Sequence, residues 1–112
     1  MKTKVLEKYN AVIIELKGDV MGGDDTKEFN QLLHKLIEEG KKNVVIDLGE
    51  VKFMNSSGLG MLISGLTTIK RENGSLKLAN VTERIESLLI ITKLITIFES
   101  YDSVDEAIKS FG

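Results

Sequence analysis

The stretch VVIDLGEVKFMNSSGLGML, residues 44–62, joins the two kinds of apolar pattern found in this chain. It opens within a nearly continuous apolar run, residues 43–48, which is typical of a central strand covered on both faces. It closes where apolar residues recur every three or four positions, as on the buried side of a helix. The stretch therefore predicts a strand–loop–helix unit. Its least usual feature is the group of mainly small and polar residues at 55–60, where the helix begins.

The helix of this unit is predicted over residues 57–71. Its apolar face is made by Leu59, Leu62, Ile63, Leu66 and Ile69. Asn55 is a strong N-cap candidate, and Ser56 is nearly as good. The other side is a stripe of small and polar residues: Ser56, Gly60, Ser64 and Thr67. An interior glycine costs about 1 kcal/mol relative to alanine, so Gly60 favours a surface that another backbone approaches closely. Alternatively, Gly58 and Gly60 allow tight packing of the helix on the sheet.

Strand and helix patterns alternate along the rest of the chain. Further strands are predicted at 5–9, 11–16, 75–79 and 95–98. The first two form a hairpin that turns at Tyr9-Asn10, residues 18–25 form a loop, and 47–57 is a loop beyond the carboxyl end of the central strand. The order β-β-α-β-α-β-α-β-α predicts an α/β fold with a mixed, mostly parallel five-stranded sheet and four helices. Functional loops of such a sheet lie beyond the carboxyl ends of its strands.

The three remaining helices are predicted from capping pairs and apolar faces. The capping pairs are Asp25 with Glu28, Asn80 with Glu83, and Ser103 with Glu106. The apolar faces are, in chain order, Phe29, Leu32, Leu33, Leu36 and Ile37; Ile85, Leu88 and Leu89; and Val104, Ala107, Ile108 and Phe111. Gly40 suits the left-handed turn that ends the first of these helices.

Composition excludes several classes of function. The 112 residues suit one domain, 1–112, and the net charge of −2 does not favour nucleic acid. Cysteine is absent and His34 is the only histidine, so no metal site, catalytic set or cofactor site is assembled. The glycines at 18–23 precede Asp24 rather than the lysine of a phosphate-binding loop. No apolar run approaches the roughly 20 residues that span a bilayer, and a cytoplasmic protein is the simplest interpretation.

The serines at the predicted helix start suit a phosphate. A phosphoryl group adds about −1.5 to −2 charge and three acceptor oxygens. At a helix N-terminus it meets free N–H groups and the positive end of the helix dipole. The fold would therefore tolerate the modification, while a partner on the Gly60/Ser64 side would be repelled or blocked.

Residues 44–62 resemble the signature of STAS domains, specifically of bacterial anti-sigma-factor antagonists. That signature is an apolar strand ending in Asp-Leu, followed by an aromatic-Met/Ile-Asp-Ser-Ser/Ala-Gly-Leu-Gly loop. Gly18-Asp19-Val20 resembles the family's turn after the first hairpin. The resemblance in element order and length extends over the whole chain.

The resemblance implies a small cytoplasmic regulator that is not an enzyme. An anti-sigma factor that is also a serine kinase would phosphorylate Ser56, using its own ATP and Mg²⁺. The unphosphorylated protein would bind that anti-sigma factor and free a sigma factor, and a metal-dependent serine phosphatase would restore this form. The expected partner surface comprises Asp19, Met21, Asn55, Ser57, Gly58, Gly60 and Ser64. Neither nucleic acid nor a membrane is an expected partner, and a homodimer remains open.

Two positions depart from the family pattern. Asn55 stands where aspartate is usual, and Met21 replaces the last aspartate of a Gly-Glu-Leu-Asp turn. Asparagine caps a helix as well as aspartate does, but it lacks the charge. These departures motivate an alternative, a STAS-type module that senses a small ligand such as a nucleotide or acts as a constitutive scaffold. An enzyme is a third interpretation, which the absence of an assembled catalytic set opposes.

Overall fold

The computed structural model describes residues 1–111 and confirms the predicted order of elements. The strands are β1 (Lys2–Lys8), β2 (Ala11–Val20), β3 (Asn43–Met54), β4 (Ser75–Ala79) and β5 (Ser100–Tyr101). The helices are α1 (Asp24–Glu38), α2 (Ser56–Arg71), α3 (Glu83–Ile91) and α4 (Val104–Lys109), with a 3₁₀ turn η1 (Leu94–Thr96).

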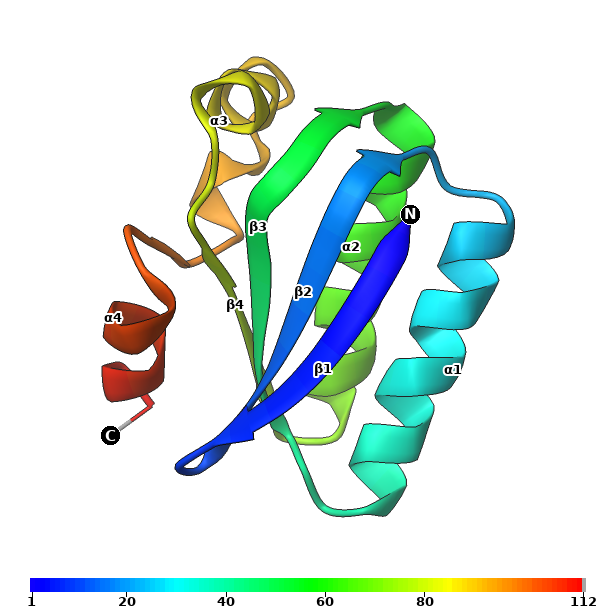
Figure 1. Ribbon diagram of the computed structural model, residues 1–112. Helices are drawn as coiled ribbons and strands as arrows, with labels where there is room; N and C mark the ends of the chain where they lie inside the picture. Colours follow the sequence, from blue (N-terminus) through cyan, green and yellow to red (C-terminus); the bar gives the residue numbers. More distant parts are fainter. Residues whose placement is uncertain (112) are drawn as a thin grey trace.

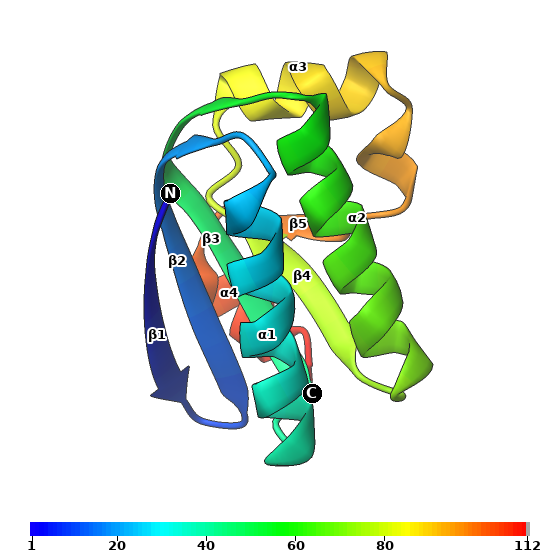
Figure 2. The same cartoon turned by 90° about the vertical axis from the view of Figure 1, so that its right-hand side faces the viewer.

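The strands form one mixed sheet in the spatial order β1-β2-β3-β4-β5. The β1–β2 hairpin is antiparallel and turns at Tyr9, which adopts a left-handed φ of 57°. The other neighbouring pairs are parallel, as predicted. Helices α1 and α2 cover one face of the sheet, α4 lies on the opposite face, and α3 lies across the end where β2 and β3 terminate (Figures 1 and 2).

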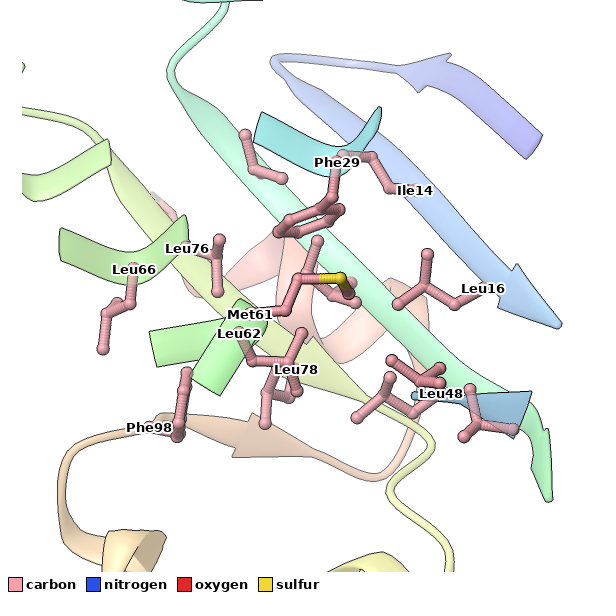
Figure 3. Close-up of a cluster of buried hydrophobic side chains, with 14 of the residues drawn as sticks. Ile14, Leu16, Phe29, Leu48, Met61, Leu62, Leu66, Leu76, Leu78 and Phe98 are labelled. Atoms are coloured by element: carbon pink, nitrogen blue, oxygen red, sulfur yellow. The ribbon is translucent and has the colours of Figure 1, made fainter. Parts of the chain in front are cut away.

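The core consists of two apolar clusters on the two faces of the sheet. The larger cluster is packed by α1, α2 and α3 and contains fully buried Phe29, Met61 and Leu62 (Figure 3). The smaller one, under α4, comprises Ala11, Ile13, Val45, Ala79, Ala107 and Ile108. Alternate residues of β2 and β3 supply both clusters, which explains the nearly continuous apolar run of the central strand.

Three strands are longer than predicted. β1 begins at Lys2 rather than at residue 5 and ends at Lys8. β2 continues to Val20 and β3 to Met54, so the predicted loops at 18–25 and 47–57 are partly strand. In the extension of β3, buried Val51 and Met54 face the core, while the residues between them are exposed. The apolar run stops at Leu48 because this part of the sheet is covered on one face only, and the pairing with β2 shifts register twice.

The prediction of a strand at 95–98 is wrong. Residues 94–96 form η1, and β5 is a two-residue strand at Ser100–Tyr101 that pairs with Leu78–Ala79. The apolar character of 95–98 instead serves packing, since Phe98 is buried and Ile95 lies against the core. A short apolar run predicts burial, but it does not by itself distinguish a strand from a packed turn.

Two of the three predicted capping pairs are also wrong. α1 is preceded by Gly23 without a side-chain cap, so Asp25 lies inside the first turn. α3 is capped by Thr82, whose hydroxyl accepts from the N–H of Ile85, because Asn80 is still in the turn that leaves β4, with φ 55°. The third prediction is confirmed, since Ser103 Oγ accepts from the Glu106 N–H at 3.1 Å.

Candidate functional site

The serine segment lies where two parallel strands end side by side. Val20 of β2 and Met54 of β3 are paired in the sheet, and α2 begins two residues after β3 ends. The N–H of Asn55 donates to the carbonyl of Val20 at 3.3 Å. This bond joins the chain leaving β3 to the end of β2, so the β2–α1 loop and the start of α2 form one surface (Figure 1).

Asn55 caps α2 as the sequence predicts. Its extended backbone precedes the helix, and its side-chain Oδ1 accepts from the Gly58 N–H at 2.7 Å. Its own carbonyl accepts the first intrahelical bond, from Leu59 at 2.9 Å. A cap of this kind leaves N–H groups of the first turn, such as those of Ser56 and Ser57, without intrahelical partners.

Ser56 is the first residue of α2, and its side chain is exposed. The first turn of the helix contains no acidic residue, and Asn55 is neutral. The positive end of the helix dipole is therefore not offset by a carboxylate in that turn. A dianionic group on Ser56 Oγ would find favourable backbone charge there and no like charge in the adjoining turn.

The predicted stripe on α2 exists, with one correction. Ser56, Ser57, Gly60, Ser64 and Thr67 are exposed, and a Cβ at Gly60 would meet no atom within 4 Å. Gly58 was predicted to contact a partner, but it is buried, and a Cβ there would lie 2.1 Å from the Val20 carbonyl oxygen. Gly58 thus allows close packing of α2 on the end of β2, whereas Gly60 leaves a flat outer surface.

Gly22 is a site residue that the sequence did not single out. It is buried, its φ is 80°, and a Cβ there would lie 2.6 Å from Ser57 Cβ. Only glycine suits both this backbone and this contact. Gly22 therefore holds the β2–α1 loop, and with it Met21, against the first turn of α2. The Gly22-Gly23 pair is the signal in the sequence that points to this position.

Residues from β2 and β3 flank the stripe. Asp19 and Met21 are exposed, as their predicted role at a partner surface requires, and Met21 leaves 47% of its surface accessible. Asp19 is paired in register with Phe53, which is 41% exposed and was not predicted as a site residue. Two large apolar side chains thus stand near Ser56 in place of the charge that aspartate would bring at position 21.

Other predicted features fall outside this surface. His34 lies exposed on α1, away from its buried face, as expected. Within residues 1–111, no group of three or more acidic, histidine or cysteine side chains is arranged to hold a metal ion. In the same range, none of the helices combines the length and apolar character needed to cross a membrane.

Known proteins resemble this chain over nearly its full length. A sequence profile described as the STAS domain matches residues 2–107. The anti-sigma-B factor antagonist of Bacillus subtilis (strain 168) is 32% identical over 111 residues, covering 96% of this chain and 92% of that protein. The phosphorylated form of SpoIIAA, a Bacillus cell fate determinant, superposes with a TM-score of 0.74 at 17% identity, covering 99% of this chain and 100% of SpoIIAA.

Further solved structures share this architecture. The unphosphorylated form of the anti-sigma factor antagonist SpoIIAA gives a TM-score of 0.73 at 15% identity, covering 97% of this chain and 96% of that one. An anti-sigma factor antagonist from Mycobacterium paratuberculosis gives a TM-score of 0.77 at 21% identity, covering 97% of this chain and 92% of that one. At these identities the likeness shows a common fold, which agrees with the predicted α/β architecture.

Proposed function

This chain belongs to the STAS domain family, and from that premise we propose that it acts as an anti-sigma-factor antagonist. Support comes from the Bacillus subtilis relative of that name, most of whose length this chain covers. The observation that carries the proposal is an exposed serine on the first turn of a capped helix, beside a flat outer stripe. No catalytic chemistry is assigned to the chain, and its action is binding.

The proposed docking surface is the exposed side of α2 with the neighbouring strand ends. Gly60 and Ser64 allow the backbone of an anti-sigma factor to approach closely, because neither carries a bulky side chain. Met21 and Phe53 offer exposed apolar area next to the serines. Binding here would occupy the anti-sigma factor and free its sigma factor.

Phosphorylation of Ser56 is the proposed switch. The anti-sigma factor, acting as a serine kinase with its own ATP and Mg²⁺, transfers the γ-phosphoryl group to Ser56 Oγ. ADP is the leaving group, and the hydroxyl proton passes to solvent. The unpaired N–H groups of the first turn stabilise the added charge, so the fold persists while the docking surface becomes anionic. A metal-dependent serine phosphatase hydrolyses the phosphoester and restores the binding form.

Asn55 suits this switch through its neutral side chain. It retains the cap that positions Ser56, and it places no carboxylate beside the incoming phosphate. Met21 replaces charge with an apolar contact on the same surface, so partner recognition there depends on burial rather than on an ion pair.

The test uses Ser56 variants with a purified anti-sigma factor of the serine-kinase type from the same organism. Ser56→Ala should abolish phosphorylation while retaining kinase binding, and Ser56→Asp should weaken binding by about tenfold or more through like charge at the interface. Mass spectrometry locates the phosphate and calorimetry measures binding. The matched control is Ser57→Ala, which should remain a substrate.

Phosphate found on Ser57 would contradict the site assignment, and unchanged binding by Ser56→Asp would contradict the switch. A nucleotide-dependent rise in melting temperature, with no phosphorylation by the kinase, would support the ligand-sensing alternative.

A further inference from the structure

The outer edge of β1 is an unpaired strand edge. β1 lies at one end of the strand order, and Figure 2 shows it at the margin of the sheet. One side of its backbone pairs with β2, and the other presents N–H and C=O groups to solvent. An extended chain can add to such an edge by main-chain hydrogen bonds, with specificity set by alternate side chains.

A basic surface borders this edge on the sheet face that carries α4. In the hairpin, Lys2 lies opposite Lys17, and Lys4 lies opposite Glu15. Buried Leu16, between Glu15 and Lys17, points to the core on the other face, so these four side chains point to the face that carries α4. Beyond the reach of α4, a hollow of about 440 Å³ is lined by Met1, Lys2, Lys17, Gly18, Glu50 and Lys52. No ion pair among residues 1–111 involves Lys2, Lys17 or Lys52. The three lysines outnumber Glu50, so the hollow is positively charged although the chain as a whole is acidic.

A groove with both apolar and charged lining borders the same edge on the other face. It lies between β1 and α1 and holds about 430 Å³. Its apolar lining is Val5, Leu32 and Leu36, and its charged lining is Glu7, Lys35, Glu39 and Lys41. Val5 is 42% exposed on the edge strand, while Leu36 belongs to the core. Glu7 and Lys41, which form an ion pair at 2.6 Å, are both part of this lining.

The two surfaces together specify one kind of occupant. We propose that the outer edge of β1 binds an extended acidic segment of a partner protein, which adds as a sixth strand. Successive residues of a strand point to opposite faces, so alternate acidic side chains would meet Lys2, Lys4 and Lys17. The apolar side chains between them would lie beside Val5 and Leu32 in the groove.

The same lysines oppose a second copy of this chain as the occupant. Residues opposite each other in paired strands point to the same face. An antiparallel pair of β1 strands centred on Val5, with the α4 faces of both copies on the same side, would set Lys2 of one copy against Lys8 of the other. Edge lysines are a common protection against self-association, and here they also select for negative charge.

The test measures binding of a dye-labelled Glu-Val-Glu-Val-Glu-Val-Glu peptide, which matches the seven residues of β1. It should bind, and amide hydrogen exchange should slow in β1. Lys2→Glu/Lys4→Glu should weaken binding by about tenfold or more. Lys70→Glu/Arg84→Glu, which changes exposed residues elsewhere by the same net charge, should bind as the parent does.

A peptide of the same composition in the order Glu-Glu-Val-Val-Val-Glu-Glu separates strand addition from simple attraction of charge. Equal binding of the two peptides would overturn the proposal, as would no binding of either or protection confined to other elements. A dimer whose β1 amides are protected would also overturn it, with a second copy as the occupant. Ser56→Asp should leave peptide binding unchanged, so this result is independent of the proposed phosphoswitch.

Discussion

Gly58 and Gly60 lie two positions apart in α2 and have opposite structural roles. A Cβ at Gly58 would collide with the backbone oxygen of Val20, and one at Gly60 would enter open space. We expect Gly58→Ala to lower the free energy of unfolding by about 1–3 kcal/mol through overpacking. Gly60→Ala should raise it by up to about 1 kcal/mol, because alanine favours the helix interior. Urea unfolding of both variants measures the difference.

Gly60→Ala should weaken binding of the anti-sigma factor although it stabilises the fold. The added methyl group projects from the proposed docking stripe, so Gly60→Ala should be more stable but a weaker ligand of the anti-sigma factor. A variant that gains stability and binds unchanged would show that the stripe is not the contact surface. A loss of stability in Gly60→Ala would contradict the open environment of this residue.

The spacing of α1 and α2 depends on a third glycine of α2. A Cβ at Gly65 would lie 2.7 Å from Phe29 Cε2 and 3.0 Å from Leu33 Cδ1, both on α1. Gly65→Ala should therefore destabilise the fold by about 1–3 kcal/mol, although alanine is the better helix former. Differential scanning calorimetry would show the lower melting temperature.

A double-mutant cycle ties this cost to the contact between the helices. Phe29→Leu removes the ring that the new methyl group would meet, so Gly65→Ala should cost less in that background. Equal costs in the two backgrounds would place the strain elsewhere. Gly60→Ala is the matched control, since it makes the same change in the same helix without a neighbour.

At the scale of the whole molecule, the hairpin is tied to the C-terminal helix. Lys8 Nζ lies 2.8 Å from Asp105 Oδ1, joining residues 97 positions apart in the chain. The hydrogen bond from Lys8, with its positive charge, lowers the pKa of the Asp105 carboxyl. We expect Lys8→Met to raise the pKa of the Asp105 carboxyl toward its ordinary value, because both the hydrogen bond and the positive charge of Lys8 are removed.

The sign of the pH effect follows from this lowered pKa. The pair contributes to stability above the unfolded-state pKa, and the contribution is lost as the pH falls through the folded-state pKa. Carboxyl-carbon NMR titration of the parent and Lys8→Met measures the pKa of Asp105. Identical titration curves would mean that the ion pair does not form in solution. Both side chains are exposed, so added salt should weaken the effect.

Much of this protein follows from its sequence alone. The alternation of apolar periods predicted the order of strands and helices, and polar residues before α2 and α4 predicted the caps at Asn55 and Ser103. These features depend on residues within a few positions of each other, so local patterns are sufficient to identify them. The exposed position of Ser56 at the start of α2 follows from the same local pattern.

Tertiary contacts decided the rest. The local sequence gives no reason to distinguish Gly58 from Gly60. Gly58 is a packing residue because the end of β2 lies against it, whereas Gly60 faces open space. The sequence predicted a strand at 95–98, where a turn buries Phe98, and it missed Gly22, whose neighbour Ser57 is distant in sequence. The groove beside β1 exists only because α1 packs near this strand, and the hollow exists only because residues of β2 and β3 lie beside it. A local pattern records how polar each residue is, whereas the distance between remote segments is set only when the whole chain packs.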